Sequence, residues 1–255
     1  MKEAHLIVQG KGGVGKSFTS MIIAQYLSSV AANDDIPVVC FDTDPVNQTF
    51  SRYKSLKPEI INILTADNTI DTRNFDALIE KLIEVDGIAV VDNGAATFVP
   101  LMSYIAENHV DELLQESGVR LILHVPIMGG QALEDCIVGL SQTINAIDAD
   151  VVVWLNEYNG AIKSSDNKLF TDFAVYKDNK SKIIGIVKVP HRNPDTYGKD
   201  IQAMTSANLT FAEVEAATDW GIMPRQRLRT VKRDLYEQLQ IIPIWVNQQK
   251  GVADE

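Results

Sequence analysis

Gly10-Lys11-Gly12-Gly13-Val14-Gly15-Lys16-Ser17 follows directly on the apolar run Leu6-Ile7-Val8, and this stretch decides how the chain folds. A strand that breaks into a glycine-rich loop and continues as a helix turns several backbone N–H groups into one concavity, which binds phosphate oxygens. The spacing is that of the GxxxxGK[ST] phosphate-binding loop, or P-loop. We therefore predict a nucleotide site in which Lys16 contacts the β- and γ-phosphates and the Ser17 hydroxyl coordinates Mg²⁺ directly. The predicted nucleotide-binding residues of this stretch are Gly10, Lys11, Gly12, Gly13, Val14, Gly15, Lys16, Ser17 and Phe18.

The same stretch also satisfies the dinucleotide-binding pattern G-x-G-x-x-G through Gly10, Gly12 and Gly15. A dinucleotide fold favours a small or apolar residue after its last glycine, where the helix packs against the sheet. Here Lys16 and Ser17 follow instead, at the positions that a phosphate and a magnesium ion require. The sequence therefore favours the P-loop.

Lys11 adds a second cation inside the loop, and an isolated loop lysine is ordinarily just solvated. At this position, however, KGGVGKS resembles the deviant Walker A motif of the ParA, MinD, nitrogenase iron-protein and Soj family of ATPases, which are SIMIBI-class P-loop NTPases. The resemblance implies that Lys11 reaches across a dimer interface to the partner's nucleotide. It therefore implies an ATP-dependent homodimer, with ATP and Mg²⁺ as cofactors and with Lys11 and Lys16 taking part in catalysis.

Two carboxylates follow the apolar run Pro37–Phe41, at Asp42 and Asp44. The carboxyl end of a central parallel strand faces the ligand crevice, so both are expected near the phosphates. The family resemblance implies that Asp44 polarises the attacking water and that Asp42 holds the magnesium hydration shell. Alternatively, one of the pair only caps the following turn, because Asp before Pro45 favours turn initiation. For Asp42 the two interpretations stay open, and for Asp44 the catalytic role is favoured.

A second apolar strand, Gly87–Val91, ends in Asp92. This is the Walker B arrangement, in which a carboxylate orders metal-bound water, so Asp92 is predicted to contact Mg²⁺ through water. By resemblance, the next residues, Asn93-Gly94-Ala95-Ala96, occupy the switch II position. They depart from the proline-rich or D-x-x-G continuations of many relatives.

Strands and helices alternate through the rest of the chain. Strands are predicted at Val119–Val125, Val151–Leu155 and Lys182–Pro190, and a helix between Gly130 and Ile144. This rhythm predicts an α/β fold with a doubly wound, mostly parallel sheet. A loop at Asp67–Asp76 is expected to lead into a short helix from Phe75 to Ile83.

Asn156 follows one of these strands, and Pro190 is the last residue of another. Relatives in the family place an asparagine after the corresponding strand to hydrogen-bond the adenine edge, so the resemblance makes Asn156 the candidate base contact. A cap of a helix or turn is the alternative. Pro190 belongs to a loop that we expect to close over the base, where the family usually has a proline.

The composition suits one large domain spanning residues 1–255, since 45% of the 255 residues are hydrophobic and no linker interrupts them. Cys40 and Cys136 fit a reduced cytoplasmic interior better than a disulfide framework, and no zinc spacing occurs. The four histidines are expected to be packing or surface residues. No apolar run approaches the length of about 20 residues that a bilayer requires, so no membrane span is predicted.

A net charge of −11 argues against non-specific DNA coating. The cations of Arg225–Arg233 belong to a predicted C-terminal helix at about 223–240, followed by a short tail, and its Leu228, Val231, Leu235 and Leu239 recur at helical spacing. We expect this helix to dock on the sheet with a solvated basic face. Direct DNA contact stays possible but is not favoured.

A narrower resemblance extends over most of the chain. QGKGGVGKS, DTDPVNQTF, VVDNGAATFVPL, VVWLN and the RQRL of the C-terminal helix are together similar to the TraL-type nucleotide-binding proteins of conjugative plasmids and integrative elements. This resemblance implies a role in conjugal DNA transfer with a protein partner from the transfer machinery. Two functions stay open: an ATP-dependent dimeric switch with slow hydrolysis, and a small-molecule kinase or ligase-type enzyme similar to dethiobiotin synthetase.

Overall fold

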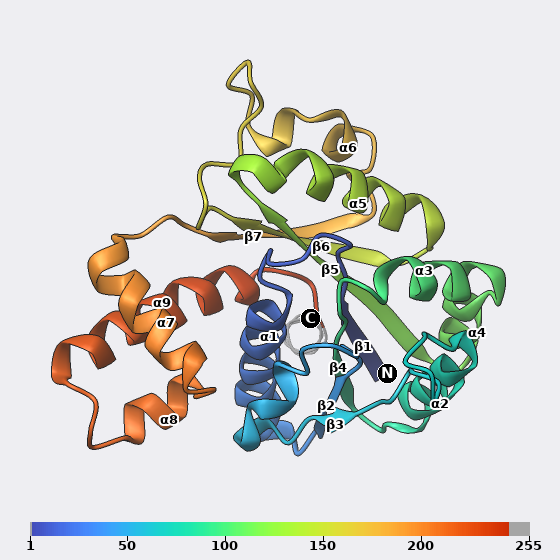
Figure 1. Cartoon of the computed structure of the whole chain (residues 1–255), viewed down its shortest axis with the longest axis horizontal. Coiled ribbons are helices and arrows are strands. Elements are labelled where there is room, and N and C mark those ends of the chain that lie inside the picture. The colour runs from blue at the N-terminus through green and yellow to red at the C-terminus, as the bar shows by residue number, and fades with distance from the viewer. Residues whose placement is uncertain (1, 245–255) are drawn as a thin grey trace, which may run out of the picture.

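The computed structural model describes residues 2–244, and its centre is a seven-stranded parallel sheet with the order β3-β2-β4-β1-β5-β6-β7 (Figure 1). The strands are β1 (Lys2–Ile7), β2 (Val38–Asp42), β3 (Glu59–Ile60), β4 (Ile88–Asp92), β5 (Val119–Met128), β6 (Asp150–Asn156) and β7 (Ile183–Val189). The α-helices are α1 (Lys16–Ala31), α2 (Phe75–Glu84), α3 (Phe98–Glu107), α4 (Val110–Glu116), α5 (Leu133–Ala146), α6 (Ala174–Lys177), α7 (Lys199–Ser206), α8 (Phe211–Ala216) and α9 (Ile222–Gln240). The predicted α/β doubly wound fold is confirmed.

Helices cover both faces of the sheet, which explains why most residues of the central strands are buried (Figure 1). On one face, α2 to α6 pack over a core that includes Leu6 and Val91. On the other face, α1 and α7 to α9 cover a second core around Ile7 and Trp154. Alternate residues of β1 thus enter different cores, as the two-residue period of a strand requires.

The order of the strands places the site. The chain runs from β1 through α1 to β2 on one side of β1, and later continues from β4 to β5 on the other side. A parallel sheet binds ligands outside the carboxyl ends of its strands where the winding direction changes. This switch point lies at the end of β1, where the P-loop begins.

A chain of hydrogen-bonded polar side chains lies within the second core. Trp154 Nε1 donates to His124 Nδ1 at 3.0 Å, and His124 Nε2 lies 2.9 Å from His5 Nδ1. His5 Nε2 lies 3.2 Å from a carboxylate oxygen of Glu3, whose other oxygen accepts from Arg120 at 3.0 Å. An indole nitrogen can only donate, so both imidazoles carry their proton on Nε2 and donate toward Glu3. Burial lowers the pKa of His124 well below its ordinary value.

The basic C-terminal helix is α9, and it docks as predicted through its buried leucines and valine. Several of its cations have acidic partners in the same chain, which leaves the helix less basic than its sequence indicates. These pairs are Arg227 with Asp200, Arg229 with Glu215 and Arg233 with Asp234 and Glu237. The predicted short tail lies mostly outside the described residues, beyond residue 244.

Some local details differ from the sequence-based expectations. The helix expected to begin at Gly130 starts with a 3-10 turn, Gly130–Ala132, and only then continues as α5. α3 and α4 were not predicted, although the apolar residues of α3 are buried in the first core. Within residues 2–244, no helix combines the length and the apolar character that crossing a bilayer requires.

Candidate nucleotide site

The P-loop connects the end of β1 to the first residue of α1, Lys16. Gly13 and Gly15 have φ angles of +73° and +100°, which glycine adopts without strain. At the start of α1, the backbone N–H groups of residues 15–18 have no acceptor in the part of the chain that the structure describes. Helix N-termini leave such donors unpaired, and together with the helix dipole they attract anions. Of the remaining loop residues, Gly12 is exposed, Val14 is buried, and Phe18 packs beside the second core.

Close packing fixes this loop from two sides. A Cβ on Gly10 would lie 2.9 Å from the ring of Phe98, and a Cβ on Gly15 would lie 3.0 Å from Asn156 Nδ2. Side chains larger than hydrogen therefore do not fit at either position without a shift. The close contact of the loop with α3 therefore depends on Gly10, and its contact with the end of β6 depends on Gly15.

Asn156 ties the end of β6 to the P-loop. Its Nδ2 donates to the Val14 carbonyl at 3.1 Å, and its Oδ1 accepts from Tyr158 N–H at 3.1 Å. The structure thus places Asn156 beside the P-loop. Its hydrogen bond with Tyr158 N–H is a turn cap, which is the alternative to a base contact. Half-buried Pro190 follows β7 at the same end of the sheet, because Glu157 N–H donates to the neighbouring Val189 carbonyl at 2.9 Å.

The loop after β6 also lies against the segment before α5. A Cβ on Gly129 would lie 2.0 Å from the Gly160 carbonyl oxygen, and one on Gly130 would lie 2.7 Å from the Asn159 carbonyl oxygen. Backbone therefore packs on backbone here, and a side chain at either glycine would separate the two segments.

Lys16 lies within the site with only 8% of its surface exposed. Its Nζ donates to the carbonyl oxygen of Lys11 at 3.1 Å, so the side chain turns back toward the P-loop. Burial lowers the pKa of Lys16, while the carboxylates of Asp92 and Asp44 favour its charged form. An incoming phosphate would compensate this buried charge.

Asp92 lies at the end of β4, and two serines of α1 donate to it. Ser17 Oγ lies 2.6 Å from Oδ2, and Ser20 Oγ lies 2.7 Å from Oδ1. Burial raises the pKa of Asp92 to about 7, and nearby Asp42 acts in the same direction, while the two serines and Lys16 oppose the shift. Ser20 was not predicted as a site residue, because a serine inside a helix gives no signal of its own.

Asp42 and Asp44 both bind backbone N–H groups of the loop after β2. Asp42 accepts from Asp44 N–H at 3.0 Å and from Ser51 N–H at 2.8 Å, and burial raises its pKa. Asp44 accepts from Val46 N–H at 2.9 Å. Each carboxylate therefore caps backbone N–H groups of this loop, as the capping alternative expects. Their contacts with water and magnesium remain predictions.

Asp44 also contacts the loop after β4. A Cβ on Gly94 would lie 2.8 Å from Asp44 Cγ. Beside this contact, Thr43 Oγ1 donates to Asn93 Oδ1 at 2.8 Å, and Asn93 Nδ2 donates to the Ile7 carbonyl at 3.1 Å. The ends of β2, β4 and β1 are therefore joined by side chains. Thr43 was not predicted as a site residue, whereas Asn93 belongs to the segment that the family resemblance places at switch II.

Lys11 points to α5 of its own chain. Its Nζ lies 2.7 Å from Asp135 Oδ2, and both side chains are substantially exposed, at 43% and 61%. The hydrogen bond to Asp135, and then its charge, raise the pKa of Lys11. Asp135 was not predicted, because no sequence signal links residues that stand this far apart in the chain.

The donor set fits magnesium bound together with a nucleotide. Within residues 2–244, no cluster of three or more histidine, cysteine, aspartate or glutamate side chains could hold a metal by itself. Mg²⁺ in nucleotide sites takes only one or two protein oxygens and completes its shell with phosphates and water. The adjacent oxygens of Ser17 and Asp92, 2.6 Å apart, suit that requirement.

Comparison with known proteins agrees with this geometry. The chain belongs to the CbiA family, described as the CobQ/CobB/MinD/ParA nucleotide binding domain, whose model matches residues 5–225. The family resemblance predicted from KGGVGKS is therefore confirmed.

Two relatives support the narrower resemblance. Two proteins named TraL from Escherichia coli are each 42% identical to this chain over 242 and 241 residues, which covers 94% of this chain and 98% of each relative.

Among solved structures, the MinC:MinD cell division protein complex of Aquifex aeolicus is similar, with 15% identity, a TM-score of 0.47, and coverage of 95% of this chain and 98% of that chain.

Proposed function

We propose that this protein is an ATP-dependent molecular switch that acts in the cytoplasm during conjugative DNA transfer. The observation that carries the proposal is the P-loop, with unpaired N–H groups at the start of α1 beside the buried ammonium of Lys16. Similarity to the TraL proteins along 94% of the chain supports the transfer role. The free, buried Cys40 and Cys136 support a reducing compartment.

In the proposed nucleotide complex, the P-loop residues 10–18 bind ATP, with Lys16 on the β- and γ-phosphates. Ser17 holds Mg²⁺ directly, while Asp92 and Asp42 hold water molecules of its shell. Asp44 orients the water that attacks the γ-phosphate, and Asn156 and Pro190 border the adenine. Magnesium supplies charge neutralisation on the phosphates, and the protein's groups position the reactants.

Two copies of the chain pair around ATP in this proposal, and Lys11 contacts the nucleotide of the other copy. Slow hydrolysis then sets the lifetime of the dimer, which binds a protein partner of the transfer machinery. A ligand shifts such an equilibrium only if it contacts the two states differently, and a γ-phosphate reached by Lys11 is such a contact. Lys11 thereby favours the switch over the kinase or ligase alternative.

The test measures oligomeric state and turnover together. We expect sedimentation to show a dimer with Mg²⁺-ATP but not with Mg²⁺-ADP or without nucleotide, using Asp44→Ala to slow hydrolysis. Equal sedimentation in all three conditions, combined with ATP turnover that increases when small carboxylic acids are added, would overturn the switch and support the enzyme alternative.

A further inference from the structure

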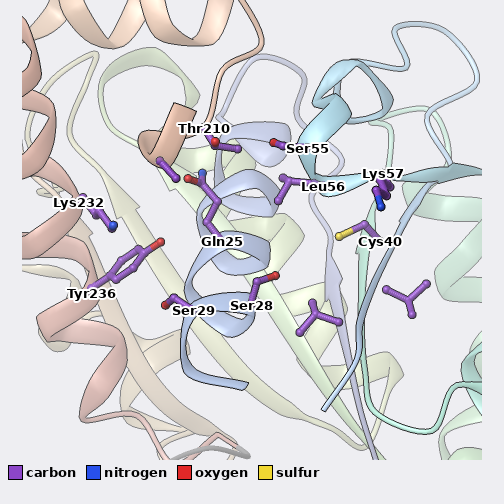
Figure 2. Close-up of a pocket in the computed structure, with 13 residues that line it drawn as sticks. Gln25, Ser28, Ser29, Cys40, Ser55, Leu56, Lys57, Thr210, Lys232 and Tyr236 are labelled. Carbon is purple, nitrogen blue, oxygen red and sulfur yellow. The ribbon is translucent and has the colours of Figure 1, made fainter. Parts of the chain in front are cut away.

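A groove crosses the second half of α1, at a distance from the P-loop. It has a volume of about 600 Å³, and none of the P-loop residues line it. Figure 2 shows Ser28 and Ser29 of α1 in its middle, with Lys232 and Tyr236 of α9 on one side and Leu56 and Lys57 on the other. Small serine side chains thus lie between larger side chains on the two sides of the groove.

The first half of β2 forms an open sheet edge in this groove. β3 has only two residues and pairs only with Phe41 and Asp42, so no described strand covers the edge of Val38–Cys40. Val38 and Val39 direct their side chains to the cores on opposite faces of the sheet, yet both line the groove. One groove can contact both faces only where it passes around a free edge.

The direction of the backbone groups is set by the neighbouring strands. The Asp42 carbonyl accepts from Ile61 N–H on the β3 side, whereas the Pro37 carbonyl accepts from Ile88 N–H on the β4 side. Since these directions alternate along a strand, Cys40 and Val38 present their backbone groups to the β3 side, like Asp42. The Cys40 N–H and both backbone groups of Val38 thus lie at the uncovered edge.

The groove is positively charged in an otherwise acidic chain. Two lysines line it and no carboxylate does, although the whole protein carries a net charge of −11. Neither Lys57 nor Lys232 has an ion-pair partner within residues 2–244, and Lys232 Nζ lies 5.5 Å from the centre of the Tyr236 ring. The nearby carboxylate of Glu213 is bound to Ser55 and Thr210 at one end of the groove.

We propose that this groove binds a short, extended, acidic segment of a partner protein, which adds to the sheet as a strand beside β2. The segment donates an N–H to the Val38 carbonyl and accepts from the Cys40 N–H, as peptides do when they extend an open sheet edge. Its carboxylates pair with Lys57 and, across the serines of α1, with Lys232. The charge selects an acidic partner, and the backbone bonds require an extended one.

This site is separate from the nucleotide site. Val38–Cys40 belong to the first half of β2, whereas the nucleotide residues Asp42 and Asp44 lie at its carboxyl end. Peptide binding therefore does not compete with ATP for the same atoms. A failure of the proposed nucleotide function would leave the groove proposal standing, and the reverse also holds.

The experiment selects short random peptides displayed on phage with the full chain, then measures each synthetic peptide by fluorescence anisotropy. We expect the selected sequences to be acidic and rich in β-branched residues. The double variant Lys57→Glu with Lys232→Glu should weaken binding at least about tenfold, since it replaces two attractions by repulsions. Lys163→Glu should leave the affinity unchanged, since this matched lysine is exposed, lies outside the groove and has no ion-pair partner among the described residues.

N-methylated peptides test the added strand without altering the protein. Methyl groups on the amides that face β2 should abolish binding, whereas methyl groups on the alternate amides should have little effect. Saturating Mg²⁺-ATP should not displace the peptide. Selection of neutral or basic sequences, equal binding to the double lysine variant, or equal binding of both methylated series would each overturn the proposal.

Discussion

Lys11 Nζ and Asp135 Oδ2 lie 2.7 Å apart within one chain. The loop lysine that the family resemblance assigns to another subunit's nucleotide thus already has an acidic partner at the start of α5. To reach a second copy, Lys11 must leave Asp135. The monomer therefore holds this side chain in a competing contact.

Releasing this contact should favour the dimer. We expect Asp135→Asn to shift ATP-dependent dimerisation to about two- to fivefold lower protein concentration, a modest effect because an exposed ion pair is weak and screened. Sedimentation across a concentration series measures the shift, and it should shrink as salt is added. Weaker dimerisation of Asp135→Asn would show that Asp135 supports the dimer instead.

Lys11→Ala should keep nucleotide binding but lose both the ATP-dependent dimer and hydrolysis. The reason is that the lost contact exists only between subunits. Calorimetry of ATP binding, paired with sedimentation, separates the two effects. A variant that dimerises and hydrolyses like the wild type would leave Lys11 as an ordinary solvated loop lysine.

Replacing Lys16 with Ala should weaken ATP binding at least about tenfold, because it removes a charge-assisted contact worth about 1.5–3 kcal/mol. Ser17→Ala should weaken binding chiefly when magnesium is present. Calorimetry with Mg²⁺ and with EDTA distinguishes the two roles. An equal loss for Ser17→Ala in both conditions would remove Ser17 from the metal site.

Asp44→Ala should bind ATP with near-normal affinity yet hydrolyse it far more slowly, since the lost interaction acts mainly in the transition state. Turnover and affinity are measured on the same preparation. The Asp44 carboxylate also caps its own loop, so thermal unfolding of the variant serves as the control for folding. Unchanged turnover would move the role to Asp42 or Asp92.

Two buried groups should make stability depend on pH in opposite directions. The pKa of Asp92 rises to about 7 in the fold, so its contribution is present at low pH and is lost as pH increases from about 4 to about 7. The pKa of His124 is lowered in the fold, so its contribution is lost as pH falls below about 6.5. Denaturant unfolding of the nucleotide-free protein measures both.

Matched variants separate these effects. In Asp92→Asn, the loss between pH 4 and 7, on the order of 3–4 kcal/mol in the wild type, should disappear. In His124→Asn, the loss on acidification should become smaller, while the amide oxygen takes the place of Nδ1 as the acceptor for Trp154 Nε1. Identical pH profiles for a variant and the wild type would show that the group titrates alike in the folded and unfolded chains.

The sequence predicted the parts of the site that depend on local pattern. The P-loop follows from glycine and lysine spacing, and Asp42 and Asp92 follow from apolar strands that end in an acid. The contacts that it did not predict are distant ones: Ser20 meets Asp92 and Lys11 meets Asp135 across 72 and 124 residues. Only the winding of the sheet brings such pairs together.

The same limit applies to the fold. Continuous apolar runs indicated most strands because both faces of the sheet are buried. β3 has only two residues, both exposed, and was not predicted. The open edge of β2 was therefore not predictable either, since it exists only because β3 is so short.

Gly94 gives the loop after β4 direct access to the Asp44 carboxylate, with no side chain between them. The loops after β2 and β4 thus share a surface, and neither can shift toward the other without moving it. A displacement of either loop toward the other would therefore meet the facing carboxylate or backbone directly. If Asp44 orients the attacking water as proposed, any change in the loop after β4 would reach that carboxylate directly.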